Sequence, residues 1–295
     1  MKGNKNEKIR MLSSITLAVV ALVWGTTFAV IKDTLSIVQP FSLMMMRFGF
    51  SSLLLFVLYI GKMKKVEIKD IKNGSIIGIF MFLAFYFMII SIKHTTASKV
   101  SFIIGAYVLI VPFLAWLINK KKPDKYAVTG AVLATVGLVF LTIEKGVAFN
   151  FWDLAVVCCS FFFAAHMIAI ERYGKNSDPI FLTVIQFIVT AGIFAFLTGY
   201  FEGYNFLILA RIKWTLGYLV VISTIIPFVI QTVVQRYISS TSTALILTLQ
   251  SVFGAIFALW YLDERMTFQM GVGCVLIFIA IVTQETKWKF LIKKD

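Results

Sequence analysis

The sequence has few charged residues and lacks any aspartate or glutamate in the middle of its long apolar runs. Charged residues make up 14% of the 295 residues and apolar residues 60%, whereas soluble domains contain about 25% charged residues. A soluble globule of this size needs more surface charge than that. Disorder is excluded as well, because the chain has 29 Phe, 10 Tyr and 6 Trp. The composition matches a lipid bilayer and predicts an all-α polytopic membrane protein.

Several chemistries are excluded by missing residues. The three cysteines, Cys158, Cys159 and Cys274, lie in apolar runs without CxxC or Cys/His spacing, so we interpret them as small buried side chains. The sequence has no Walker loop, which argues against an ATP-driven engine in this chain. Intramembrane aspartyl catalysis would need two buried acids, and a membrane metalloenzyme would need clustered His and carboxylate ligands. The sequence shows neither pattern. We therefore expect no cofactor, no metal site and no enzymatic activity.

Ten apolar stretches are long enough to cross the hydrocarbon core, which takes about 20 helical residues. The connections between these stretches are short. The first apolar stretch is too long for a signal peptide and lacks a convincing cleavage site, so we interpret it as a membrane span. The predicted spans are Met11–Ile31, Pro40–Ile60, Gly74–Ile92, Ser98–Ile118, Tyr126–Ile143, Phe151–Ile170, Pro179–Phe201, Trp214–Tyr237, Thr241–Leu262 and Thr267–Gln284.

The basic residues are distributed unevenly between the two sides of these spans. With the amino terminus inside, 20 of the 28 Lys and Arg residues fall on the cytoplasmic side and 7 on the other, and Arg47 lies within a span. This asymmetry predicts a multi-pass protein of the cytoplasmic membrane with both termini in the cytoplasm. The net charge of +14 then reflects orientation beside anionic lipid, and no nucleic-acid partner is expected. The oligomeric state stays open, and a monomer is compatible with the sequence.

The two halves of the chain resemble each other. At an offset of 139 residues, Thr27–Phe48 aligns with His166–Phe187, so that Pro40 meets Pro179 and Arg47 meets Gln186. At an offset of 144, Val108, Phe113 and Trp116 meet Val252, Phe257 and Trp260. We therefore expect two five-helix repeats, residues 1–145 and 146–295. An odd number of spans per half gives the repeats inverted topology, the architecture of many transporters with a substrate site near the midplane.

An ordered series of short motifs runs along nearly the whole chain. It comprises Trp24-Gly25-Thr26-Thr27-Phe28, Pro40 with Arg47, Thr95–Ser98 with Phe102–Pro112, and Gln235–Tyr237 through Leu262–Arg265. In order and spacing the series resembles the EamA-type branch of the drug/metabolite transporter superfamily. The resemblance implies ten helices and movement of small metabolites, often amino acids and commonly outward. The chain departs from the family pattern at Gln250-Ser251, where the family often has Glu-Pro.

Polar side chains within spans should face the bundle or a cavity. Arg47 is interpreted either as a carboxylate clamp or gate partner, or as an arginine that fixes the fold. His166 and Gln186 can contact substrate or gate the inner mouth, and His166 can carry a proton; a packing hydrogen bond is the alternative. Gln231 and Gln235 share a helix face one turn after Pro227, which is expected to kink the helix and free a carbonyl. The full set of candidate substrate-site residues is Trp24, Thr27, Arg47, Tyr86, Tyr107, His166, Gln186, Gln231, Gln235, Gln250 and Trp260.

Two further expectations complete the sequence-based hypothesis. Gly74/Gly78 and Gly271/Gly273 predict close helix packing. The function expected is a secondary transporter of a small-molecule substrate in the lipid bilayer, exporting amino acids or related compounds by alternating access. The alternatives are an importer or nucleotide-sugar-type exchanger of the same superfamily and, from other classes, a membrane-embedded enzyme or a receptor or assembly subunit.

Overall fold

A computed structural model describes residues 2–62, 67–95, 97–120, 122–142, 151–175, 177–261 and 267–287, and every regular element in these ranges is helical. The α-helices of the first half are α1 (Lys2–Thr34), α2 (Pro40–Tyr59), α3 (Ile68–Ile92), α4 (Ala97–Gly105), α5 (Tyr107–Asn119) and α6 (Lys125–Thr142). Those of the second half are α7 (Phe151–Tyr173), α8 (Pro179–Leu197), α9 (Leu209–Gly217), α10 (Ile226–Val234), α11 (Ser240–Leu247), α12 (Leu249–Tyr261) and α13 (Phe268–Thr286). Short 3-10 helices η1 (Ile60–Lys62) and η3 (Phe206–Ile208) and π-helices η2 (Thr198–Glu202) and η4 (Tyr218–Ile225) complete the described elements.

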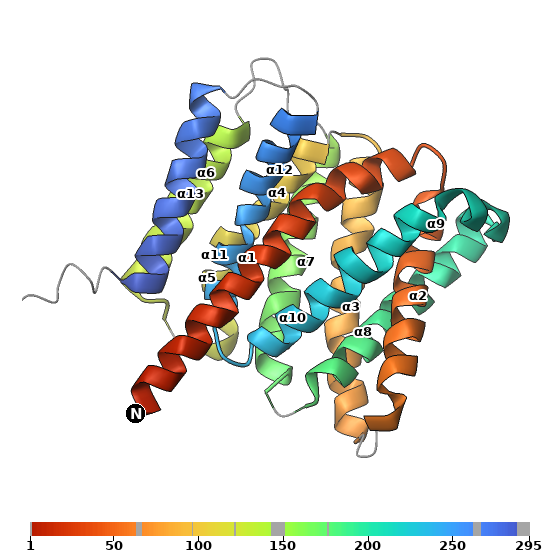
Figure 1. The fold of residues 1–295 in the computed structure, drawn as a ribbon, viewed down its shortest axis with the longest axis horizontal. Coiled ribbons are helices and arrows are strands. Elements are labelled where there is room, and N and C mark those ends of the chain that lie inside the picture. Colours follow the sequence, from red (N-terminus) through yellow and green to blue (C-terminus); the bar gives the residue numbers. More distant parts are fainter. Residues whose placement is uncertain are drawn as a thin grey trace, which may run out of the picture.

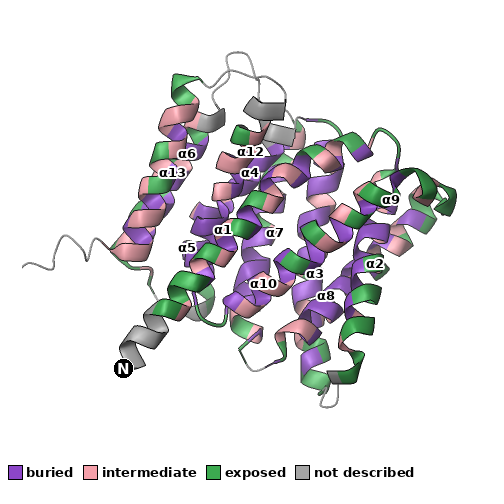
Figure 2. Cartoon of the chain, viewed as in Figure 1, coloured by how far each residue is buried: buried purple, intermediate pink, exposed green. Residues whose placement is uncertain are grey.

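The helices match a membrane in length and in surface. Eight helical stretches in the described ranges, some of which join consecutive elements, are long and apolar enough to cross a bilayer, and Lys125–Phe140 is a shorter apolar helix. Large apolar side chains such as Leu58, Phe196 and Phe278 are more than 60% exposed, and exposed residues follow the outward sides of the bundle in Figure 2. Such surfaces are stable in lipid and not in water. The chain is therefore an integral membrane protein.

The prediction of ten spans is only partly supported. The predicted span Tyr126–Ile143 corresponds to the shorter apolar helix α6, and Thr241–Leu262 is divided at Thr248 into α11 and α12. The predicted fourth span is also divided, at Ala106, although its residues Val100–Ile118 are long and apolar enough to cross. The number ten thus stays a prediction. Residues 63–66 and 143–150, which carry part of the charge asymmetry, lie outside the described residues.

The two halves of the chain pack through helices that are distant in sequence. Helix α3 packs against α7 and α8, α2 against α8, and α1 against α12, while α6 and α13 run side by side at one edge (Figure 1). Carboxylates fasten both ends of the α2–α8 pair. Glu202 accepts the backbone N–H groups of Phe41 and Ser42 at 2.8 and 2.7 Å, and Asp178 accepts the Tyr59 hydroxyl at 2.6 Å. The Glu202 contacts satisfy donors at the amino-terminal end of α2, and the Asp178 contact joins its other end to the second half of the chain.

Small residues permit the closest of these approaches, as predicted for Gly74 and Gly78. A Cβ added at Gly74 would lie 2.7 Å from Ile185, and one at Gly78 would lie 2.9 Å from the Gln186 Cα and 2.9 Å from the Val189 Cβ. The α3–α8 contact therefore depends on the absence of side chains at both positions.

We expect Gly78→Val to lower the free energy of unfolding by about 1–3 kcal/mol, because the added atoms must displace the backbone of α8. Thermal unfolding of the purified protein in detergent measures the change. Gly192→Val is the matched control, since nothing lies within 4 Å of a Cβ added there. The close-packing interpretation is wrong if Gly78→Val unfolds at the same temperature as this control.

Candidate functional site

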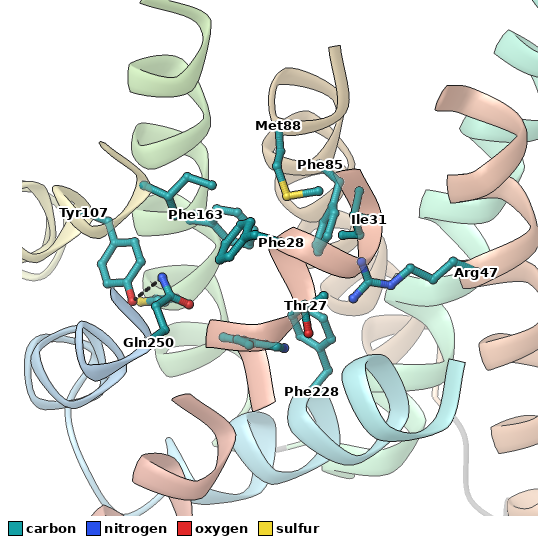
Figure 3. Close-up of a pocket in the computed structure, with 13 residues that line it drawn as sticks. Thr27, Phe28, Ile31, Arg47, Phe85, Met88, Tyr107, Phe163, Phe228 and Gln250 are labelled. Atoms are coloured by element: carbon teal, nitrogen blue, oxygen red, sulfur yellow. Dashed lines mark hydrogen bonds between the residues drawn. The ribbon is translucent and has the colours of Figure 1, made fainter. Parts of the chain in front are cut away.

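A cavity lies where the two halves of the bundle meet. Its walls come from α1, α2, α3, α4, α5, α7, α10 and α12, and its volume is about 30 Å³. A cavity needs a volume of roughly 10–15 Å³ to hold one water molecule. In this conformation the cavity therefore has room for about two waters. Most of the lining is apolar and aromatic: Trp24, Phe28, Ile31, Phe85, Met88, Ile104, Phe163, Met167 and Phe228. Its other lining residues are Thr27, Arg47, Tyr107 and Gln250, and Figure 3 shows Arg47 on the opposite side from Tyr107 and Gln250.

Arg47 is a buried cation held by uncharged partners. Its side chain, on α2, is 1% exposed. Its Nε donates to the Thr224 hydroxyl at 2.6 Å, and its Nη2 donates to the Ser223 hydroxyl at 3.1 Å and the Ser223 carbonyl at 3.2 Å. The rings of Phe85 and Phe48 lie 5.1 and 5.6 Å from its guanidinium carbon, within reach of cation–π attraction. Nη1 has no hydrogen-bond partner among the described residues.

The acceptors of Arg47 lie on an irregular helix. The π-helix η4 ends just before Pro227, which lacks an N–H, so the Ser223 carbonyl one turn earlier loses its usual helical donor. That carbonyl instead accepts from the Trp24 indole at 3.1 Å as well as from Arg47. The Ser223 hydroxyl also lies 2.9 Å from that of Thr27. The carbonyl expected to be freed near Pro227 thus binds Arg47 and Trp24, whereas Ser223 and Thr224 were not anticipated from the sequence.

Tyr107 and Gln250 form the second polar part of the wall. The Gln250 side-chain amide donates to the Tyr107 hydroxyl at 3.4 Å, and both side chains are at least 98% buried. Each residue follows a break in its helix, at Ala106 and Thr248. The backbone of Gln250 also approaches α1 closely, because a Cβ added at Gly25 would lie 2.8 Å from the Gln250 carbonyl oxygen. This end of the cavity offers neutral hydrogen-bonding groups.

A second buried polar cluster lies next to the cavity. The Nε2 of His166 lies 2.9 Å from the side-chain oxygen of Gln186, so this nitrogen donates to the oxygen. The His166 Nδ1 and the Gln186 amide nitrogen have no partner in the described part of the chain. The ring of Phe228 lies edge to face with His166 at 5.9 Å and also lines the cavity. Phe228 therefore separates this pair from the cavity.

The remaining candidate residues have other surroundings. The Gln231 amide donates to Gln235 at 3.2 Å, and Gln235 donates to the backbone carbonyl of Met167 at 2.9 Å; neither lines the cavity described above. Tyr86 stacks on Phe41 at 5.9 Å and also lies outside that lining. The side chain of Trp260 lies outside the described residues. The structure thus brings Trp24, Thr27, Arg47, Tyr107 and Gln250 to one cavity.

Comparison with known proteins gives the class. The EamA-like transporter family matches the chain twice, over residues 11–143 and 150–283. The chain therefore belongs to this family of the drug/metabolite transporter superfamily and carries two of its repeats.

Individual relatives agree with this class. A protein named as an uncharacterized transporter of Archaeoglobus fulgidus is 33% identical over 277 residues, covering 92% of this chain and 85% of its own. A second transporter of that organism is 24% identical, covering 96% of this chain and 99% of its own. The Bacillus subtilis transporter YyaM is 25% identical over 57% of this chain and 58% of its own. A crystal structure with 14% sequence identity shares the fold at a TM-score of 0.77, covering 95% of this chain and 99% of that one. The protein is a membrane transporter of the EamA type.

We expect Thr224→Val to destabilise the protein by about 1–3 kcal/mol, because it leaves a buried charged donor of Arg47 without its acceptor. Combining it with Arg47→Met should cost less than the sum of the two single changes, since the unpaired donor is then gone. Unfolding in detergent of the parent protein, the two single variants and the double variant gives the interaction free energy between Arg47 and Thr224. Thr135→Val is the control, because the Thr135 hydroxyl donates only to Ala131 one turn earlier in its own helix. Strict additivity would contradict the geometry described here.

Proposed function

We propose that the protein is a secondary transporter that exports a small metabolite with a carboxylate group, an amino acid or a related compound, by alternating access. The observation that carries this proposal is the guanidinium of Arg47, which lines the cavity and keeps Nη1 without a partner among the described residues. A cation buried in a membrane is costly unless it is paired. A substrate carboxylate supplies the missing opposite charge and accepts from Nη1 and, after local rearrangement, from a second guanidinium nitrogen.

The rest of the cavity suits the body of such a molecule. Aromatic rings of Trp24, Phe28, Phe85, Phe163 and Phe228 surround the middle, and favour an apolar or flat group. The Tyr107 and Gln250 end supplies neutral donors and acceptors for a second polar group of the substrate. Because the cavity has room for about two waters, a metabolite enters only after a wall moves.

The proposed architecture consists of ten membrane helices in two inverted units, residues 1–145 and 146–295, with both termini in the cytoplasm. Three observations support it. The family matches each half of the chain separately. The helices that carry Tyr107 and Gln250 are interrupted at related places, Ala106 and Thr248. The basic residues favour the side on which the termini lie. Export rather than import, and amino acids rather than nucleotide sugars, are the parts of the proposal that flux measurements decide.

The direct test uses counterflow in proteoliposomes with a panel of labelled amino acids and related carboxylates. We expect Arg47→Gln to reduce flux of a carboxylate substrate at least about tenfold, because a neutral amide cannot supply the opposite charge. We expect Arg47→Lys to recover little of this flux, since an ammonium lacks the planar fork.

Lys93→Gln is the matched control, because Lys93 is an exposed cation outside the cavity. Methyl esters of the same compounds separate charge recognition from general damage to the carrier. If Arg47→Gln transports the carboxylate as well as the parent protein does, Arg47 is a structural residue and the carboxylate proposal is wrong.

The His166–Gln186 pair gives a prediction about coupling. We favour facilitated movement over proton coupling, and expect His166→Gln to alter apparent affinity while leaving maximal exchange intact, since an amide can replace the hydrogen bond that imidazole makes to Gln186. If transport is proton-coupled, the same change should abolish the effect of a pH gradient and leave downhill exchange. Counterflow with and without an imposed gradient measures both. Concentrative uptake that requires the gradient and survives His166→Gln contradicts either role for His166.

A further inference from the structure

Two turns that carry the cavity walls lie at opposite ends of the bundle. The α3–α4 turn follows Ile92, and the α10–α11 turn spans residues 235–239. In Figure 1 the first lies at the upper end of the view and the second at the lower end. Helix α3 supplies Phe85 and Met88 to the cavity, and α10 supplies Phe228. Each turn therefore ends a helical hairpin that supplies part of the cavity wall.

A single cation fastens the α3–α4 turn to α1. The ammonium of Lys32, near the end of α1, donates to the carbonyls of Ile92 and Thr95 at 2.7 and 2.6 Å. The Ile92 carbonyl belongs to the last residue of α3, where helical acceptors lack partners and the helix dipole is negative, and the Thr95 carbonyl belongs to the turn that follows. The contact joins α1 to the α3–α4 hairpin by charge and hydrogen bond together.

An anion of α7 holds the start of α11, beside the Gln235–Met167 hydrogen bond that also ties this turn to α7. The carboxylate of Glu171, near the end of α7, accepts the backbone N–H of Ser240 at 2.7 Å. Ser240 is the first residue of α11, where helical donors lack partners and the dipole is positive. The two contacts are equivalent by position, because Lys32 plus the repeat offset of 139 residues is Glu171.

We propose that Lys32 and Glu171 are paired latches, each of which holds the cavity closed at one face of the membrane, so that releasing one opens one face and releasing the other opens the opposite face. Both latches are engaged in this structure, and the cavity beside the two hairpins is only about 30 Å³. The two residues are positioning residues that act through the hairpins. The inference rests on the proposed alternating-access function.

Other contacts also hold each turn in place. His94 stacks on Trp152 at 4.0 Å, which ties the α3–α4 turn to the start of α7. Arg236 donates to the Gly174 carbonyl at 3.1 Å, which ties the α10–α11 turn to the α7–α8 loop. Loss of one latch should therefore shift the population of open states without unfolding the hairpin.

The experiment measures access to the cavity from each side and needs no substrate. Cys158, Cys159 and Cys274 are replaced by Ala, and Met88→Cys places a reporter thiol in the cavity wall. A membrane-impermeant maleimide is added to sealed right-side-out or inverted vesicles. We expect Lys32→Met to raise labelling roughly tenfold from the face that holds the α3–α4 turn, and Glu171→Leu to raise it by a similar factor from the opposite face.

Matched variants control for charge and for general loosening. Lys93→Met and Lys175→Met remove exposed cations close to the two turns, and should leave labelling from both faces unchanged. Glu171→Gln keeps a carbonyl acceptor of the same reach, and should restore most of the closure that Glu171→Leu removes. If Lys32→Met fails to assemble, Lys32→Gln, which keeps an N–H donor but loses the charge and some reach, tests the same latch by the same labelling, and should raise labelling from the face that holds the α3–α4 turn.

The outcomes separate this inference from the proposed function. Labelling that rises from opposite faces in the two variants supports the latches, even if no tested solute is carried and the proposed substrate class is wrong. Labelling that rises from the same face in both variants, or from both faces equally, overturns the latches while leaving carboxylate transport intact. Unchanged labelling with only a lower unfolding temperature also overturns them, because Lys32 and Glu171 are then helix caps alone.

Discussion

The buried guanidinium of Arg47 is the constraint on which the rest of the site depends. A permanent cation inside a membrane protein must be held by polar groups, and here these are the hydroxyls of Ser223 and Thr224 and one backbone carbonyl. That carbonyl is available because Pro227 supplies no N–H and the preceding turns form a π-helix. The irregular π-helix η4 thus supplies the acceptors that the charge of Arg47 on α2 requires. Their interaction joins the two halves of the chain beside the cavity.

Aromatic rings lie beside this interaction and continue along the cavity wall. Rings of Phe85 and Phe48 lie 5.1 and 5.6 Å from the guanidinium carbon, within reach of cation–π attraction. Phe228 continues this layer, with ring contacts to Trp24 at 5.1 Å, to Phe187 at 5.8 Å and to His166 at 5.9 Å. A single ring therefore contacts the cavity on one side and the His166–Gln186 pair on the other, so that motion of Phe228 can couple the two clusters.

Much of the fold and part of the site could be predicted from the sequence. Apolar length gave the membrane helices, and the scarcity of charge within spans singled out Arg47, which lies in the cavity with Trp24, Thr27, Tyr107 and Gln250. Ser223 and Thr224 could not be selected, because hydroxyls are common in membrane helices and only the π-helical register turns these two toward Arg47. The one signal was their place one turn before Pro227. Tyr86 was expected to line the substrate site, but it packs against Phe41 outside the cavity lining. Aromatic residues are so frequent in this chain that the sequence does not separate cavity rings from packing rings.

The latch residues carry a consequence for how duplicated halves diverge. A helix–turn–helix corner exposes carbonyls where its first helix ends and amides where its second helix begins. A cation can clasp the former and an anion the latter, so aligned positions such as Lys32 and Glu171 can keep an equivalent mechanical task while exchanging the sign of their charge. Drift of this kind is limited by the reach of the side chain rather than by its chemistry. Counting identical residues between the halves therefore misses pairs such as Lys32 and Glu171, which differ in charge and still make equivalent contacts.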